Sequence, residues 1–406
     1  MGEKKLTPLK RFSNFTDNWK PISIKEIGDS YRGGGTPKTT KEDYWNGDIP
    51  WIQSSDLNEG DFFLGAARKQ ITELGLMNSA TKLIKKNSLA IVTRVGVGKL
   101  SLIPFEYTTS QDFLSISDLN IDKHFAIYVL FKKLQEESKS LQGTSIKGIT
   151  SGELLSKEVI IPSNSLEQQK IGQFFKILDE RIANQERKIA KVKALKAAYL
   201  TEMFPQEGET VPKRRFKGFE DDWRQFELAK LTDLYVGKSF TSSIESNGKY
   251  IVMDMGSVSQ EGNRLIHKKT NLKRNILLKE DLVMPKDDIG GGHIIGKTAY
   301  INQNNRYVLG DHVYGLRFQN NYGLFMHYCI NSKPINKNIR RKATGSAQLG
   351  IGGVNVLNTI VVLPSLEEQQ KIGEFFKNLD NQIETEEKKL YKLQKMKEAY
   401  LEEMFV

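Results

Sequence analysis

The sequence predicts an α+β protein with two β-rich mixed α/β globules, joined by two long repeated helices that form an antiparallel coiled coil with pseudo-twofold symmetry. The first observation is a phrase of twelve residues, QQKIGQFFKILD at 168–179, which returns at 369–380 with ten identical positions. The second is a repeat of apolar residues every 3.5 positions through both copies, which is typical of a coiled-coil seam. The third is that the segments between are rich in Gly, Asn and Ser turns separating short β-branched runs, which indicates twisted sheet.

Each half of the chain runs in the same order: an arm, a globule and a helix. The arms share the pattern PxxRFxxFxDxW, which begins at Pro8 and again at Pro212. Three aromatic residues in so short a segment predict that each arm packs against the rest of the protein, and we expect it to contact the other half. The predicted boundaries are an N-terminal arm at 1–19, a first globule at 20–162, a central helix at 163–205, a second arm at 206–223, a second globule at 224–364 and a C-terminal helix at 365–406.

The two helices are predicted to begin with capping boxes, Ser165-x-x-Gln168 and Ser365-x-x-Glu368. Eight of ten seam positions are apolar in each copy, and the polar exceptions fall at the same two places. The predicted seams are Ile171, Phe175, Leu178, Ile182, Gln185, Ile189, Val192, Lys196, Tyr199 and Met203, and Ile372, Phe376, Leu379, Ile383, Glu386, Leu390, Leu393, Lys397, Tyr400 and Met404. Pairing of one copy with the other is the expected solution. The alternative is that each helix packs on its own globule.

Charge is distributed unevenly along the 406 residues, whose formal net charge is +11. The net charge is +3 for 1–165, +3 for 166–205, +8 for 206–363 and −3 for 364–406. Basic globules favour a polyanionic partner such as DNA or RNA. The longest apolar run, at 125–131, is too short to span a membrane, and a single cysteine, Cys329, suits a reducing cytoplasm.

A search for catalytic motifs yields one match, the segment 291–298, which fits G-x-x-x-x-G-K-[ST], the phosphate-binding loop of ATPases. That loop requires a helix directly after the Lys and Thr. Here a β-type run, AYINQNN, follows, so we interpret the segment as a loop between strands. The five histidines show no metal-ligand spacing and no G-x-S-x-G elbow is present. The sequence therefore predicts a non-catalytic protein without a metal site.

The duplicated phrase EQQKI, at 167–171 and 368–372, resembles the specificity subunit of type I restriction–modification enzymes. Further matches to that family are GGTP at 34–37, IPWI at 49–52 and the Phe-x-Gly-Phe of the second arm at 216–219. The second globule departs from the pattern, with GKSF at 237–240 and YIVM at 250–253 at the places of GGTP and IPWI.

The resemblance implies that each globule is a target-recognition domain that reads one half of a bipartite, asymmetric site in double-stranded DNA. The helices would set the gap between the half-sites and bind two methyltransferase subunits, which use S-adenosylmethionine. A restriction and translocation subunit, using ATP and Mg²⁺, would complete a cytoplasmic bacterial complex, while this chain itself would bind no cofactor.

Candidate DNA contacts are Arg, Lys, Asn, Gln and hydroxyl side chains on turns that can reach a groove. In the first globule these are Arg32, Lys38, Gln53, Ser54, Arg68, Lys69, Arg94, Lys99, Thr144, Ser145 and Lys147. In the second they are Lys238, Arg264, Lys268, Lys273, Arg274, Lys286, Lys297, Arg340, Arg341, Lys342 and Gln348.

Residues that recur in both helices without a place in the seam are candidates for docking of the methyltransferase. They are Gln168, Phe174 and Lys176, and Gln369, Phe375 and Lys377. The alternative for the two phenylalanines is that they widen the intramolecular core. Two other functions stay open for the whole chain: a coiled-coil adaptor whose globules bind proteins, and a nucleotide-binding protein that uses the segment 291–298.

Overall fold

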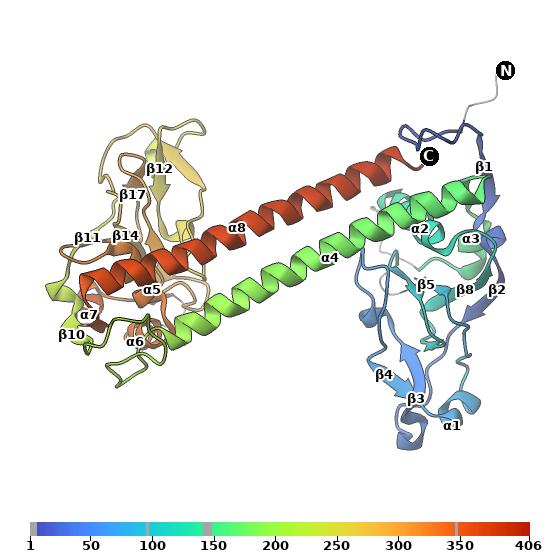
Figure 1. Cartoon of the computed structure of the whole chain (residues 1–406), viewed down its shortest axis with the longest axis horizontal. Coiled ribbons are helices and arrows are strands. Elements are labelled where there is room, and N and C mark those ends of the chain that lie inside the picture. The colour runs from blue at the N-terminus through green and yellow to red at the C-terminus, as the bar shows by residue number, and fades with distance from the viewer. Residues whose placement is uncertain (1–5, 95–96, 141–147, 346–347) are drawn as a thin grey trace. The chain divides into compact units, whose positions relative to one another are not determined.

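The structure is a computed structural model that describes residues 6–94, 97–140, 148–345 and 348–406. The chain divides into two compact units (Figure 1). Unit 1 comprises Met1–Glu186 and Lys389–Val406, and unit 2 comprises Arg187–Lys388. Each unit thus combines one globule with the start of one long helix and the end of the other, so the units of the fold differ from the two halves of the sequence.

The described residues of unit 1 form three small sheets, and its globule is built around them. A four-stranded sheet has the order β2-β8-β5-β6, a three-stranded sheet the order β4-β3-β7, and β1 pairs with β9. The strands are β1 (Trp19–Ser23), β2 (Gly28–Gly33), β3 (Trp45–Ile52), β4 (Lys69–Ile71), β5 (Ser88–Val92), β6 (Leu100–Ile103), β7 (Thr108–Thr109), β8 (Phe113–Leu119) and β9 (Glu158–Pro162). The helices of the globule are α1 (Glu73–Met77), α2 (Lys123–Ser140) and α3 (Ser151–Ser156).

Unit 2 repeats this strand order. Its sheets run β11-β18-β14-β16 and β13-β12-β17, β10 pairs with β20, and a further pair joins β15 and β19. The strands are β10 (Arg224–Glu227), β11 (Thr232–Val236), β12 (Tyr250–Met253), β13 (Lys268–Thr270), β14 (Leu282–Pro285), β15 (Asp287–Asp288), β16 (Ala299–Tyr300), β17 (Tyr307–Leu309), β18 (Val313–Phe318), β19 (Leu349–Gly350) and β20 (Ile360–Leu363). The helices are α5 (Gly323–Asn331), α6 (Lys333–Arg341) and α7 (Gly353–Leu357). The two globules, unlike in sequence, therefore share one topology.

The two long helices are α4 (Ser165–Glu202) and α8 (Leu366–Glu403). Within unit 1 the start of α4 lies against the end of α8, because Lys397 pairs with Asp179 at 2.6 Å. Within unit 2 the start of α8 lies against the end of α4, because Lys196 pairs with Asp380 at 2.5 Å. The two helices are therefore antiparallel within each unit.

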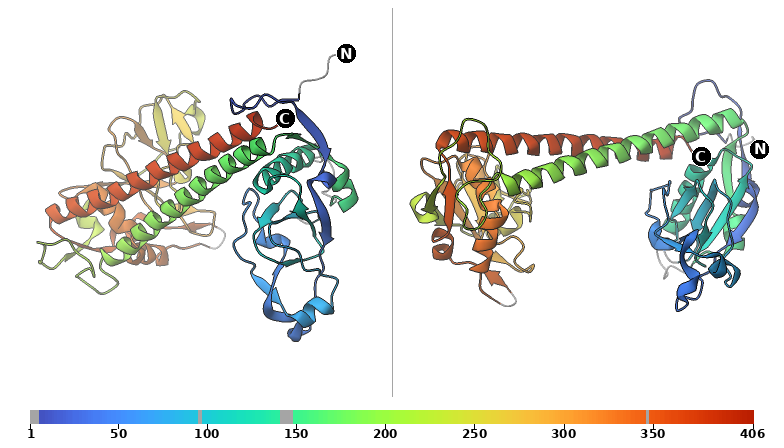
Figure 2. Two further views of the ribbon diagram at one scale, coloured as in Figure 1. Left: turned by 45° about the vertical axis from the view of Figure 1, so that its right-hand side comes forward. Right: turned by 60° about the horizontal axis from the view of Figure 1, so that its bottom comes forward.

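The described residues of both predicted seams are buried or half-buried, so the 3.5-residue pattern identified the inward face of each helix. The alternative packing also occurs, because the seam residues near each globule enter its core. In unit 1, Phe175 lies 5.0 Å from the ring of Tyr128 on α2 and 5.6 Å from that of Phe405. Figure 2 shows α2 beside the start of α4.

The helix starts differ from the predicted capping boxes. The side chain of Asn164, rather than that of Ser165, caps α4 by accepting a hydrogen bond from the backbone N–H of Leu166 at 2.9 Å. Ser365 does cap α8, accepting from the N–H of Glu368 at 3.4 Å. Gln168 does not complete the predicted capping box, because its side chain forms hydrogen bonds with the backbone of Pro162 and Asp122.

The loop 291–298 is followed by strand β16, so it lacks the helix that a phosphate-binding loop of the ATPase type requires. This agrees with the interpretation of the segment as a loop between strands. In the described ranges, no group of His, Cys, Asp and Glu side chains is arranged to hold a metal ion. Within those same ranges, no helix is long and apolar enough to cross a bilayer.

Candidate functional site

Each arm is bound to the start of a long helix by a bidentate salt bridge between an arginine and a glutamate. Arg11 donates from Nε and Nη2 to the two carboxylate oxygens of Glu167, at 2.6 and 2.7 Å. Arg215 does the same to Glu368, at 2.7 and 2.8 Å. Both carboxylates are fully buried, and the hydrogen bonds to them raise the pKa of each arginine. The arm thus packs on the helix of its own half, a contact that its aromatic pattern did not predict.

The arm of unit 1 also contacts the other half of the sequence. Trp19 lies edge-on to Phe125 at 6.0 Å and to Phe405, the penultimate residue, at 6.5 Å. The backbone N–H of Lys10 donates to the carbonyl of Glu403 at 2.7 Å. The predicted contact between arm and partner half is therefore present at the end of α8, alongside the contact with α4.

The recurrence of Gln168 and Gln369 has an intramolecular cause, which corrects their assignment as docking residues. Both are buried, at 5% and 3% exposure. Gln168 donates to the carbonyl of Pro162 at 2.9 Å and accepts from the N–H of Asp122 at 3.1 Å. Gln369 likewise bonds the carbonyl of Pro364 and the N–H of Tyr322, both at 3.1 Å. Each glutamine ties a long helix to its globule and has no surface to offer to a partner.

The other predicted docking residues keep some exposure. Phe174 is half-buried between Phe12, at 6.1 Å, and Tyr400, at 5.1 Å. Phe375 occupies the matching place between Phe216, at 5.7 Å, and Tyr199, at 5.1 Å. These contacts favour the alternative that the phenylalanines widen the core.

The two lysines of the docking set lie at the surface of their own helices. Lys176 is half-buried and pairs with Glu180 at 3.6 Å. Lys377 is exposed and pairs with Glu374 at 3.4 Å.

A second recurring contact, missed in the sequence, joins the helix pair to each globule. Tyr128 donates to Asp179 at 2.7 Å, and Tyr328 donates to Asp380 at the same distance. Burial is the main cause that raises the pKa of both tyrosines. Each carboxylate also receives the lysine at the polar seam position, Lys397 or Lys196. The polar exceptions to the seam are thus explained in part, since these lysines complete Tyr–Asp–Lys contacts. The Asp that ends both copies of the duplicated phrase, Asp179 and Asp380, was the sequence feature from which this contact could have been predicted.

In unit 1, several predicted DNA contacts gather around the three-stranded sheet β4-β3-β7. Gln53 and Ser54 follow β3 directly, and Arg68 and Lys69 stand at the start of β4. Lys38 is held nearby, because its carbonyl accepts from the indole of Trp45 at 3.3 Å. Four of these candidates therefore lie at one end of the β3–β4 pair, and Lys38 lies beside the start of β3.

The remaining candidates of unit 1 lie elsewhere or outside the described residues. Arg32 is exposed on β2, an edge strand of the four-stranded sheet. Arg94 and Lys99 flank the connection between β5 and β6. Thr144, Ser145 and Lys147 lie outside the described residues.

The three-stranded sheets place different side chains at equivalent positions. Trp51 pairs with Lys69 in unit 1, and Val252 pairs with Lys268 in unit 2. Lys69 lies over the rings of Trp45 and Trp51, at 5.8 and 5.7 Å. Lys268 instead binds the carboxylate of Asp254 at 2.7 Å, which raises the pKa of the lysine. The same strand position therefore presents a lysine that lies over indole rings in unit 1 and a lysine paired with a carboxylate in unit 2.

Glycine marks the same turn in both units. A Cβ on Gly34 would lie 2.0 Å from the carbonyl oxygen of Ser110, and one on Gly237 would lie 1.5 Å from that of Gly310. Only glycine fits so close to a backbone carbonyl. GKSF at 237–240 thus begins with the same structural glycine as GGTP, although the other residues differ.

Several predicted DNA contacts of unit 2 have structural partners within the unit. Arg264 binds Asn302 at 2.5 Å and the hydroxyl of Tyr307 at 2.9 Å. Arg274 donates to the carbonyl of Ser239 at 2.5 Å. Further partners are Asp254 for Lys268, Asp287 for Lys286, Glu207 for Arg341 and the carbonyls of Asn355 and Asn358 for Lys342.

Four predicted residues of unit 2 are exposed at its surface, namely Lys238, Lys273, Arg340 and Gln348, and Lys297 is half-buried. Lys297 and Arg340 meet at a cavity, whereas Lys238 and Lys273 do not line it. Unit 2 therefore brings its candidates together less than unit 1 does.

The two globules share one topology and stand on a duplicated helical frame, but they carry different side chains at equivalent strand ends. This arrangement is that of a protein with two recognition modules. A family model described as "Type I restriction modification DNA specificity domain" matches residues 16–194 and 220–395. The chain belongs to this family.

Similar proteins include named specificity subunits. The chain is 32% identical over 174 residues to the type I restriction enzyme MjaIX specificity subunit of Methanocaldococcus jannaschii, covering 42% of this chain and 40% of that one. It is 35% identical over 171 residues to the EcoR124I/EcoR124II specificity subunit of Escherichia coli, covering 40% and 41%. The chain thus spans about two fifths of the length of these relatives. With the MjaVIII specificity subunit of M. jannaschii it is 22% identical over 402 residues, covering 95% and 91%.

Solved structures show the same fold at low sequence identity. The S subunit of a type I restriction–modification system from M. genitalium superposes with a TM-score of 0.65 at 17% identity, covering 98% of this chain and 99% of that one. A chain from a study of complex assembly in a type I system gives a TM-score of 0.54 at 15% identity, covering 94% and 96%.

Proposed function

We propose that this chain is the DNA-reading, non-catalytic subunit of a type I restriction–modification complex. Each globule binds one half of a bipartite, asymmetric site in double-stranded DNA, and the two long helices set the gap between the half-sites. Methyltransferase subunits bring S-adenosylmethionine, and a translocating nuclease subunit brings ATP and Mg²⁺. This chain contributes sequence recognition and a frame for assembly.

The observation that carries the proposal is that the two globules share one topology but differ in the side chains at their surfaces. The residues that recur between the units are those that hold arm, helix and globule together, such as Arg11 and Arg215. The residues at the ends of β3 and β12 do not recur. A duplicated scaffold with two different sets of polar and basic side chains is what reading two different half-sites requires.

The test of two-headed reading is an exchange of one globule. Residues 20–162 are replaced by the corresponding globule of a relative, the chain is expressed with its methyltransferase and nuclease subunits, and the methylated sites are mapped by genome sequencing. We expect one half of the recognised sequence to change and the other half to stay. Changes in both halves would contradict the proposal.

The competing adaptor function makes a different prediction about salt. A DNA-reading subunit that neutralises several phosphates loses affinity steeply as salt rises, because condensed counterions are released on binding. Fluorescence anisotropy with duplex DNA at several salt concentrations measures this slope. Absence of salt-dependent DNA binding would favour the adaptor.

Docking of the methyltransferase is proposed for the exposed part of the recurring set, Lys176 and Lys377 with the accessible edges of Phe174 and Phe375. Two equivalent patches suit two copies of one partner. We expect Lys176→Glu with Lys377→Glu to abolish co-purification of the methyltransferase without changing the melting temperature. The matched control, Lys20→Glu with Lys230→Glu, alters the same charge on exposed lysines of the globules and should leave recruitment intact. Equal recruitment by both double variants would rule out docking at these lysines.

A further inference from the structure

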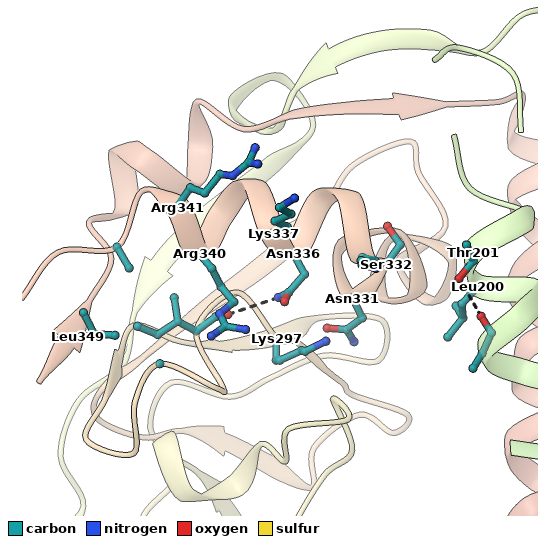
Figure 3. Close-up of a pocket in the computed structure, with 15 residues that line it drawn as sticks. Leu200, Thr201, Lys297, Asn331, Ser332, Asn336, Lys337, Arg340, Arg341 and Leu349 are labelled. Carbon is teal, nitrogen blue, oxygen red and sulfur yellow. Dashed lines mark hydrogen bonds between the residues drawn. The ribbon is translucent and has the colours of Figure 1, made fainter. Parts of the chain in front are cut away.

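Unit 2 contains a cavity of about 640 Å³ between α6, the loop at 291–297 and the last turns of α4 (Figure 3). Its size falls in the range of small-molecule sites. Ala197 and Leu200 of α4, with Ile295 and Leu349, supply apolar lining. The polar lining is dominated by cations and amides rather than by carboxylates.

The cations that line this cavity are Lys297, Lys333, Lys337, Arg340 and Arg341, and two of them converge. Lys297 comes from the glycine-rich loop and Arg340 from α6, and Figure 3 shows both on the cavity side of that helix, while Arg341 points the other way. Arg341 is engaged by Glu207 at 3.1 Å. Across the part of the chain that the structure describes, no ion pair is formed by Lys297 or Arg340. The two cations therefore face one recess without a bound counter-charge.

The surroundings of Lys297 disfavour its positive charge. Burial is the main cause that lowers the pKa of Lys297, and the charge of Arg340 lowers it further, against a smaller opposing effect of Glu261. An anion between the two cations would offset both effects, since hydrogen bonds between charged groups are the stronger ones.

The local sequence builds the recess. Gly292 and Gly296 both have positive φ. A Cβ on Gly292 would lie 2.7 Å from Leu349, and one on Gly296 would lie 2.8 Å from Ile339. The loop is fixed from inside, because Asp288 accepts hydrogen bonds from the N–H groups of Gly290 and Ile294, at 2.6 and 3.0 Å.

A break in the helix directs Arg340 to the cavity. Ser332 separates α5 from α6, and Pro334 stands in the first turn of α6, where its missing N–H is tolerated. In unit 1 the corresponding helix, α2, is continuous over 18 residues. The recess is therefore a specific addition to the fold of unit 2.

We propose that this cavity is a binding site for a phosphoryl group, held between Lys297 and Arg340. The group can come from two sources: a phosphodiester of the DNA backbone, or a free phosphorylated compound whose apolar part lies against Leu200 and Leu349. The cradle differs from that of an ATPase loop, because side chains rather than the start of a helix hold the anion. The inference does not rest on the proposed function, since the free anion is itself a probe.

The first arm of the test uses inorganic phosphate with the full-length protein. Isothermal titration calorimetry should show saturable binding to the natural chain. Lys297→Gln and Arg340→Gln should each weaken it roughly tenfold or more, since each removes a charge-assisted hydrogen bond. The control Lys230→Gln removes an exposed lysine of the same unit that does not line the cavity and should bind as the natural chain does. Unchanged melting temperatures would show that the variants are folded.

The second arm distinguishes the two sources with duplex DNA. If the group is a DNA phosphodiester, Arg340→Gln should reduce the slope of log affinity against log salt by about 0.9, and Lys230→Gln should not. If phosphate binding is lost in the cavity variants while the DNA slope is unchanged, the site takes a free phosphorylated compound. Two results together would overturn the proposal. Phosphate either does not bind or binds equally to all variants, and the DNA slope of Arg340→Gln equals that of the control.

Discussion

Unit 1 and unit 2 carry the same sheets in the same strand order, while their globules share little sequence. The arm is fastened by Arg11 and Glu167 in one unit and by Arg215 and Glu368 in the other, with bond lengths that agree within 0.1 Å. Where the units differ, the differences concentrate on side chains at strand ends and on the helix that follows β8 or β18. The comparison indicates that the recurring residues maintain the architecture, whereas side chains that this framework does not require differ between the units.

The helix after the four-stranded sheet shows how far the units diverge within one topology. Tyr128 and Tyr328 make the same contact with the helix pair, so their neighbours can be compared directly. The residue before each tyrosine is Ile127 in unit 1 and the buried His327 in unit 2. An apolar core position in one unit is thus a titratable group in the other, which gives the comparison a measurable consequence.

The largest expected effect concerns the two clamps between arm and helix. Arg11→Ala and Arg215→Ala should each destabilise their unit by about 3–5 kcal/mol, because each leaves a fully buried carboxylate without its partner. Urea unfolding measures the loss. Equal losses of unfolding free energy would support the same role for both salt bridges. A large loss for one variant only would show that the two salt bridges are not equivalent.

Two control variants sharpen this test. Arg214 pairs with Glu202 at the exposed surface, where solvent screens the pair, so Arg214→Ala should leave the urea unfolding curve nearly unchanged. Replacing both partners, Arg11→Met with Glu167→Met, should recover much of the stability lost in Arg11→Ala, since no unpaired charge remains. Failure of the double variant to recover stability would show that the clamp acts through geometry rather than charge pairing.

The sequence predicted the parts of this fold that depend on local periodicity. The seam repeat, the two long helices and the arms follow from spacing and could be placed within a few residues. The common strand order of the globules could not, because pairing such as β3 with β7 depends on contacts distant in sequence, and the side chains that form them have diverged. Recurrence alone also misassigned Gln168 and Gln369, since a residue repeated for an internal hydrogen bond looks the same as one repeated for a partner.

The candidate DNA contacts were predictable only as residue types. Charge and turn context select a lysine at both Lys69 and Lys268, but the sequence does not show that Asp254 neutralises the second. Likewise the strand that follows 291–298 could be predicted from the sequence, while the convergence of Lys297 with Arg340 depends on a helix break at Ser332, distant from the loop in sequence.

The next effect is a difference in acid sensitivity between the units. Burial lowers the pKa of His327 to about 3, against an ordinary value of 6.5, and Lys196, Arg264 and Lys297 lower it further. Between these values the unfolded chain binds a proton that the folded unit does not, so stability falls as pH drops below 6.5. The loss should reach about 2 kcal/mol at pH 5.

The matching variant copies unit 1 into unit 2. His327→Ile places the residue of Ile127 at the equivalent position and should flatten the dependence of unit 2 stability on pH between 6.5 and 5. Its absolute stability is expected to change as well, because Thr298 and Asn331 lose their contacts with the ring. Thermal melts of both chains across this pH range decide the matter: the same pH slope in the two chains would show that another group causes the acid sensitivity.

The smallest expected effect tests whether equivalent strand positions do different work on DNA. Lys69 lies over two indole rings, whereas Lys268 is already paired with the carboxylate of Asp254. Lys69→Gln should therefore reduce the slope of log DNA affinity against log salt by about 0.9, which is the contribution of one released counterion. Lys268→Gln should change this slope little, because removing it also exposes the carboxylate that it had neutralised. Anisotropy titrations of both variants at four salt concentrations measure the difference. If both variants lose the same slope, Asp254 does not neutralise Lys268 in the complex; if neither does, the three-stranded sheets do not face the DNA backbone at these positions.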